Sequence, residues 1–136
     1  MRVFLDANIL FSAAKSAGAV RKLVHELLDL GHDCRIDEYV VIEARRNLAA
    51  KDPAALIEFE SLLKRLHISP AQAPGPELGL VNWLPGKDRV VLAAAIRLRC
   101  EVLVTGDHTH FGAGYGKVFA GVTLYSPRAL AEKTFE

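Results

Sequence analysis

Val3-Phe4-Leu5-Asp6 is a short apolar run that ends in an aspartate, and the interpretation of the whole chain starts from it. A second run of the same kind, Val102-Leu103-Val104-Thr105-Gly106-Asp107, follows late in the sequence. In an open parallel sheet, ligands gather outside the carboxyl ends of the strands. If both runs are parallel strands, their two aspartates point at one mouth.

Outward from these runs, strand-like segments alternate with helical ones. Caps and prolines mark helix starts at Asp37, Asp52-Pro53 and Ser126-Pro127. Residues 108–116 are predicted to form a glycine-rich loop. Strands are predicted at about 2–5, 34–36, 67–68, 102–104 and 122–125, and helices at about 9–14, 19–30, 38–49, 53–66, 77–84, 87–99 and from 127 onward. This alternation favours an α/β fold with a parallel sheet covered on both faces.

Size and composition fit a single domain over residues 1–136. A hydrophobic fraction of 51% in a chain of this length allows a sizeable core. No apolar stretch approaches the roughly 20 residues that cross a bilayer, and the N-terminal run lacks the features of a signal peptide. We therefore expect a cytoplasmic protein without a membrane partner. Because the net charge is only +1, any attraction for nucleic-acid phosphates must be local.

Asp6 and Asp88 each have a structural alternative to a functional role. Asp6 could cap the helix that follows it, although Asn8 is better placed for that cap. Asp88 could stabilise a helix N-terminus. However, Asp88 shares the buried stripe of its helix, because Val91 and Leu92 follow at i+3 and i+4. This pattern favours a functional role for Asp88.

Glu43 and Asp107 mean less when each is taken alone, because solvated helix glutamates and turn aspartates are ordinary. The inference depends on the set of four acids: Asp6, Glu43, Asp88 and Asp107. Converging carboxylates raise one another's pKa unless a cation is bound. Mg²⁺ and Mn²⁺ prefer such oxygen ligands, and an ion held in this way can activate water for phosphodiester hydrolysis.

Basic residues flank two of the acids in the sequence. Arg45 and Arg46 follow Glu43, while Lys87 and Arg89 stand on either side of Asp88. If the acids converge, these residues form a rim for RNA phosphates; the alternative is ordinary solvated helix charge. Because arginine makes bidentate phosphate contacts, Arg46 and Arg89 are the preferred candidates.

Histidine and cysteine do not form a zinc pattern. His108 and His110 lie in the predicted loop without cysteine partners or the i, i+4 spacing of helical ligands. A plain loop role is the main prediction for them, with a substrate contact next to Asp107 as the alternative. Cys34 and Cys100 lack metal-ligand spacing, so we expect reduced thiols.

With these motifs in place, the chain resembles the PIN domains, and within them the VapC-like toxins of type II toxin–antitoxin pairs. The segments that carry the resemblance are Val3–Leu10, Val40–Ala44, Lys87–Ala95, Leu103–Asp107 and Val122–Arg128. They occur in the family's order and span nearly the whole chain.

The resemblance implies a three-layer α/β/α sandwich around a parallel sheet of roughly five strands, and Mg²⁺- or Mn²⁺-dependent cleavage of RNA. The four acids would be the metal ligands and catalytic residues. Asn8 and Thr105 would be polar supports near the metal, grouped with Arg46 and Arg89 as substrate-binding residues. The implied partners are an RNA substrate, a cognate antitoxin and a second copy of the chain in a homodimer.

Two other functions remain open from the sequence. An aspartyl phosphotransferase or phosphatase would use Asp6 as its nucleophile, but haloacid-dehalogenase-like enzymes carry an aspartate two positions on, where this chain has Asn8. The other alternative is a non-toxin or catalytically silent PIN-type RNA-binding module. The intact acids argue against a silent module, because converging carboxylates without a cation are costly to keep.

Overall fold

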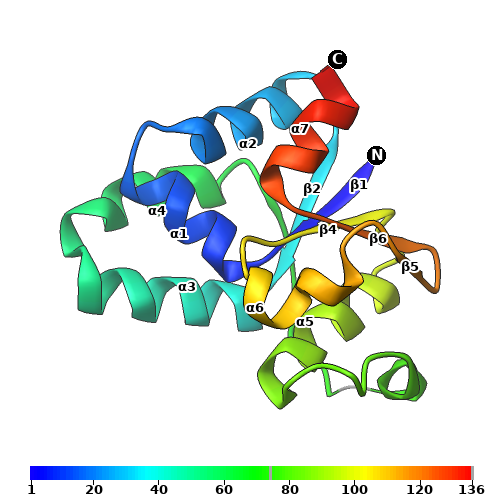
Figure 1. The fold of residues 1–136 in the computed structure, drawn as a ribbon. Coiled ribbons are helices and arrows are strands. Elements are labelled where there is room, and N and C mark those ends of the chain that lie inside the picture. The colour runs from blue at the N-terminus through cyan, green and yellow to red at the C-terminus, as the bar shows by residue number, and fades with distance from the viewer. Residues whose placement is uncertain (74, 136) are drawn as a thin grey trace.

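Six strands form one sheet in the order β3-β2-β1-β4-β6-β5 (Figure 1). The structure, a computed structural model, describes residues 1–73 and 75–135, so the domain predicted over 1–136 includes two residues, Pro74 and Glu136, outside this description. The strands are β1 (Arg2–Leu5), β2 (Asp33–Asp37), β3 (His67–Ser69), β4 (Val102–Val104), β5 (Val118–Phe119) and β6 (Val122–Tyr125). All pairings are parallel except that of β5 with β6, which is antiparallel. The α/β class is confirmed, and β5 adds a strand that the sequence did not predict.

Helices cover both faces of the sheet, with α1, α2 and α4 on one side and α5 on the other (Figure 1). The helices are α1 (Ala7–Lys15), α2 (Ala19–Asp29), α3 (Glu38–Lys51), α4 (Leu56–Leu63), α5 (Gly86–Arg97), α6 (His108–Phe111) and α7 (Pro127–Phe135). Three short 3₁₀ segments lie at Pro53–Ala55, Pro76–Leu80 and Gly112–Gly114. The predicted three layers are therefore present.

Three predicted segments differ in detail from the structure. The helix expected over 53–66 begins as a 3₁₀ turn and becomes α4 only at Leu56, and the helix expected over 77–84 is instead the 3₁₀ segment Pro76–Leu80. The loop expected over 108–116 contains α6, because the Asp107 side chain accepts a hydrogen bond from the His110 N–H and caps the helix. Short turns of this kind carry no periodic signal in the sequence.

The core is densest along the central strands. Val3, Phe4 and Leu5 of β1 are fully buried, as expected for a parallel strand covered on both faces. Cys34 and Cys100 are also buried, and burial raises the pKa of Cys34 to about 12 and that of Cys100 to about 11. Within residues 1–73 and 75–135, no helix is long and apolar enough to span a membrane.

The position of the site follows from the strand order. From β1 the chain passes through α1 and α2 to β2, whereas from β4 it passes through α6 to β5 and β6, on the other flank of the sheet. The connections therefore diverge between β1 and β4, which is where open α/β sheets form their ligand crevice. The register pairs Leu5 with Val104, so Asp6 and Thr105 leave the sheet side by side.

Candidate active site

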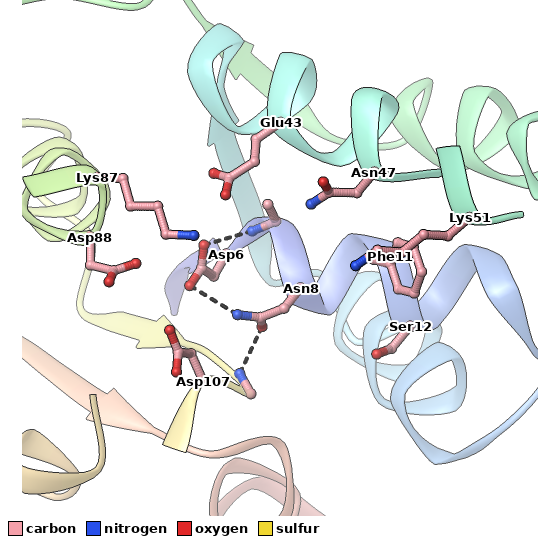
Figure 2. A pocket seen from close by; sticks show the side chains of 12 residues that line it. Asp6, Asn8, Phe11, Ser12, Glu43, Asn47, Lys51, Lys87, Asp88 and Asp107 are labelled. Carbon is pink, nitrogen blue, oxygen red and sulfur yellow. Dashed lines mark hydrogen bonds between the residues drawn. The ribbon is translucent and has the colours of Figure 1, made fainter. Parts of the chain in front are cut away.

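Four carboxylates from four separate elements line one cleft of about 300 Å³. Asp6 follows β1, Glu43 lies on α3, Asp88 is in the first turn of α5, and Asp107 lies just beyond β4. Figure 2 shows these side chains directed into the same space, together with the ammonium group of Lys87. The structure thus brings together all four acids that the sequence singled out.

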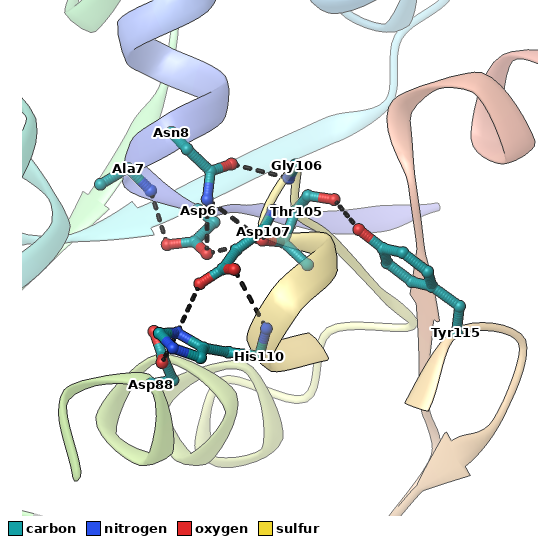
Figure 3. Close-up of polar contacts among 9 residues, drawn as sticks. All are labelled: Asp6, Ala7, Asn8, Asp88, Thr105, Gly106, Asp107, His110 and Tyr115. Atoms are coloured by element: carbon teal, nitrogen blue, oxygen red, sulfur yellow. Dashed lines mark hydrogen bonds and ion pairs between the residues drawn. The ribbon is translucent and has the colours of Figure 1, made fainter. Parts of the chain in front are cut away.

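Asp6 is held by hydrogen bonds to both of its carboxylate oxygens (Figure 3). Oδ1 accepts from the Ala7 N–H at 2.7 Å, and Oδ2 accepts from Thr105 Oγ1 at 2.8 Å and from Asn8 Nδ2 at 3.2 Å. Asp6 is therefore the N-cap of α1. The expectation that Asn8 caps this helix is wrong, because the Asn8 side chain reaches across to β4 instead.

Asn8 and Thr105 connect the end of β1 to the end of β4. Asn8 Oδ1 accepts from the Gly106 N–H at 2.7 Å, and Thr105 Oγ1 accepts from the Asp107 N–H at 3.1 Å. A Cβ atom at Gly106 would lie 3.3 Å from Asn8 Oδ1, so glycine keeps this approach free of strain. Since Thr105 is fully buried, it can position the acids but cannot touch a substrate.

The acids shift one another's protonation equilibria. Burial raises the pKa of Asp6 to about 6; its hydrogen bonds oppose the shift, and the charges of Glu43 and Asp88 add to it. Burial also raises the pKa of Asp88, with His110 opposing the shift and Asp107 reinforcing it. Asp6 and Asp88 are therefore harder to ionise than ordinary aspartates, and a cation bound between them would oppose this effect.

The donor set fits a divalent cation. Asp88 is only 6% exposed, and its Oδ2 atom, although 2.8 Å from His110 Nδ1, accepts no hydrogen bond of acceptable geometry from the described residues. Buried carboxylate oxygens without a donor are rare, and a bound ion is one of the usual reasons for them. Carboxylate oxygens are also the ligands that Mg²⁺ and Mn²⁺ prefer. The residues present therefore fit a bound metal ion.

Of the basic residues that flank the acids in the sequence, Lys87 and Arg46 lie in or beside the cleft. Lys87 lines it directly, and Arg46 lines an adjoining depression of about 310 Å³ that shares Lys87, Glu43 and Asn47 with it. The depression extends the cleft past α3. A phosphate chain that enters the cleft from this side meets both positive charges.

Arg45 and Arg89 do not take part in this surface. The Arg89 side chain donates to the backbone carbonyls of Leu84 and Asn82, which fixes the turn before α5. Arg45 pairs with Glu60 at 2.7 Å, away from the cleft. The structure therefore separates Arg89 from the acids, so the substrate-binding role suggested by its sequence position gains no support from its contacts.

Sequence reasoning missed the far end of the cleft. Asn47 and Lys51 lie on α3 at four-residue steps from Glu43, and Phe11 lies three residues after Asn8 on α1. Lys51 Nζ stands 5.7 Å from the centre of the Phe11 ring. Helical spacing could have predicted these residues, because residues at i+3 and i+4 share one helix face with Asn8 on α1 and with Glu43 on α3.

Solved structures share the fold of this chain. A chain in the VapBC2 structure from Rickettsia felis, bound to a DNA fragment from the promoter, superposes with a TM-score of 0.70 at 17% identity, covering 93% of this chain and 98% of that one. DNA-bound VapBC from Salmonella typhimurium gives 0.69 at 14% identity, and FitAcB from Neisseria gonorrhoeae gives 0.65 at 19%, each with the same two coverages. The fold is PIN-like.

The likeness lies in the fold rather than in the sequence. No protein-family model matches the chain, and no curated protein matches it in sequence. TM-scores of 0.65 to 0.70 over 93% of the chain confirm the PIN-like fold predicted from the motifs, although the identities are only 14% to 19%. What the cleft of this PIN-like chain does must be argued from its own residues.

Proposed function

We propose that the chain is a metal-dependent endoribonuclease whose active site is the acidic cleft. The observation that carries this proposal is the convergence of Asp6, Glu43, Asp88 and Asp107, two of them with raised pKa values, at the crevice of the sheet. These four residues would hold Mg²⁺ or Mn²⁺. When bound, such an ion lowers the pKa of a water and stabilises the charge that develops on the phosphodiester.

The chain's own residues supply binding and orientation. Figure 2 shows Lys87 and Lys51 on opposite sides of the cleft, with Asp6, Glu43 and Asn47 between them. Lysines at both ends suit a single strand whose phosphates cross the acids, and Phe11 beside Lys51 offers a ring on which a base can stack. Thr105 and Asn8 keep Asp6 in place, and Glu43 would act as a metal ligand or orient the attacking water.

Of the predicted partners, the antitoxin is supported by the structures that share the fold. Those structures are named as VapBC and FitAB assemblies, several of them bound to DNA. We therefore propose that this chain is the toxin of a type II toxin–antitoxin pair, with an antitoxin that would cover the cleft. The homodimer and the cytoplasmic location remain predictions from the sequence.

The phosphotransferase alternative loses support from the contacts of Asp6. A nucleophilic carboxylate needs an oxygen that can reach a phosphorus atom. Asp6 is 5% exposed, and its two oxygens together accept three hydrogen bonds. This geometry suits a fixed ligand better than a nucleophile.

RNA cleavage by the purified protein tests the proposal. A fluorescently labelled single-stranded RNA should be cut in Mg²⁺ or Mn²⁺ and remain intact in a chelator. Asp6→Asn should abolish cleavage, while Asp33→Asn, a control at the amino end of β2, should cut like the wild type. A folded Asp6→Asn protein that cuts equally well, or cleavage that survives the chelator, would overturn the proposal. Wild-type protein that binds the ion but cuts no RNA would favour the silent binding module.

A further inference from the structure

The short helix α6 brings His110 next to two of the cleft acids. The Asp107 side chain accepts from the His110 N–H at 3.1 Å, and this cap turns the histidine ring back toward α5. As Figure 3 shows, the ring then stands between two of the acids. His110 Nδ1 lies 2.8 Å from Asp88 Oδ2 and 2.8 Å from Asp107 Oδ2.

These close contacts are not directed as hydrogen bonds. Among the described residues, neither His110 Nδ1 nor Asp88 Oδ2 has a hydrogen-bond partner of acceptable geometry, although both atoms are buried. The Asp88 side chain is 8% exposed and aims into the cleft. Leaving a buried carboxylate oxygen and a buried ring nitrogen unsatisfied is costly, so this pair is better explained by a ligand that both atoms share.

The spacing of the three atoms suits ligands on one cation. The donor atoms of Asp88, Asp107 and His110 all lie within 4.8 Å of one another. Neighbouring ligands of an octahedral ion, each about 2.1 Å from the ion, lie about 3 Å apart. The two nitrogen–oxygen distances are close to this value.

We infer that His110 is a nitrogen ligand of the metal centre and that the site therefore selects a transition-metal ion, Mn²⁺, over Mg²⁺. Magnesium favours an all-oxygen shell, whereas first-row transition-metal ions accept imidazole nitrogen, and Mn²⁺ is the one among them that also suits carboxylate oxygens. The ring must present the Nδ1 lone pair and carry its proton on Nε2. This inference rests on the proposed function only in that both use Asp88 and Asp107.

Pulsed electron paramagnetic resonance of Mn²⁺ bound to the full-length protein gives a readout independent of RNA cleavage. The wild type should show coupling of the manganese to a directly bound nitrogen. His110→Ala should lose it, while His108→Ala should keep it, because His108 is an exposed histidine of the same helix that packs against Tyr115. The wild-type and His108→Ala spectra decide the point even if His110→Ala folds poorly.

Calorimetric titration separates a ligand from an internal counter-ion. If His110 is a ligand, His110→Ala should weaken Mn²⁺ binding at least about tenfold and should weaken Mg²⁺ binding less. The lower bound is the loss seen when only a residue that supports a ligand is mutated. If His110 is instead a cation that the metal displaces, His110→Ala should bind both ions more tightly, and the inference is overturned. It is equally overturned if wild-type Mn²⁺ shows no nitrogen coupling.

The outcomes also separate this inference from the proposed function. Metal-dependent RNA cleavage without nitrogen coupling would remove only the role of His110. Nitrogen coupling without RNA cleavage would remove only the nuclease. A wild-type protein that binds neither ion would overturn both.

Discussion

Aspartates at the two ends of the sheet are treated in opposite ways. At the amino ends of the strands, Asp33 Oδ2 lies 2.8 Å from Arg35 Nε and 3.4 Å from Arg2 Nε. At the carboxyl ends, Asp6 faces further acids across the cleft. Burial raises the pKa of Asp33, but the hydrogen bond from Arg35 and the neighbouring positive charges outweigh it, so the pKa lies below its ordinary value. The pKa of Asp6 is instead raised to about 6.

The difference distinguishes charges that serve the fold from charges that serve a ligand. The carboxylate of Asp33 finds its counter-charges within the chain and favours the folded state. The carboxylate of Asp6 is held in place by hydrogen bonds yet lacks a cationic partner at bonding distance among the described residues. A buried acid kept at such a cost is characteristic of a functional site.

The largest expected effect is on catalysis. Asp88→Asn and Asp107→Asn should each lower kcat/KM for RNA about 10³-fold, because each removes a charged ligand from a centre that contributes several kcal/mol to transition-state stabilisation. Asp33→Asn should stay within about twofold of the wild type. Initial rates in Mn²⁺, with circular dichroism to check folding, measure this. Equal losses at both ends of the sheet would contradict the distinction.

The next effect is on stability as a function of pH in the absence of metal. The folded-state pKa of Asp6 is about 6, against 3.8 as its ordinary value, so between these pH values the folded state binds more protons than the unfolded state. Stability should therefore fall as pH rises through this window, by about 3 kcal/mol from this group. Urea denaturation of the wild type and Asp6→Asn across pH 4 to 7 should show a difference that grows with pH. A difference independent of pH would refute the shift.

A smaller effect is expected on RNA binding. Lys87→Met should raise KM several-fold and reduce the slope of log affinity against log salt by about 0.7, the value for one phosphate contact on a single strand. Arg45→Met is the matched control, because Arg45 pairs with Glu60 outside the cleft. Fluorescence anisotropy at several salt concentrations measures the slope for each variant. Identical slopes for Lys87→Met and Arg45→Met would mean that Lys87 does not contact an RNA phosphate.

The smallest effect is on stability at the amino ends of the strands. Asp33→Asn should cost less than about 1 kcal/mol at pH 7, because the Asp33 side chain is 40% exposed and solvent screens its ion pairs. The pKa of Asp33 is lower in the folded state than in the unfolded state. Its contribution to stability is therefore fully present at pH values above the unfolded-state pKa and is lost as the pH falls through the folded-state pKa. Denaturation at pH 7 and pH 3 checks the sign. A loss at pH 7 well above this size would mean that Asp33 has a further role.

The sequence predicted the parallel core because its apolar runs leave strong local signals, and it predicted the four acids because they stand out as a set. Runs such as Val102–Val104 end at a polar residue, and Asp88 shares a buried helical stripe. Strand β5 was missed because two residues cannot show an alternating pattern. The helix α6 was missed because its cap depends on the rotamer of Asp107.

Side-chain partners across the fold were beyond the reach of the sequence. Arg89 flanks Asp88 in the chain, yet it bonds to the turn before α5, and only the tertiary structure decides which way it points. His110 was predicted to be a loop residue because its contact with Asp88, a residue far from it in the sequence, leaves no local pattern. Asp6 serves both as helix cap and as cleft acid. The two roles had been treated as alternatives.

A crystal soaked in Mn²⁺, with diffraction recorded on either side of the manganese absorption edge, locates the ion without reference to activity. We predict an anomalous peak among the carboxylate oxygens of Asp6, Glu43, Asp88 and Asp107. A crystal that takes up manganese only elsewhere, with the four acids carrying no peak between them, would contradict it.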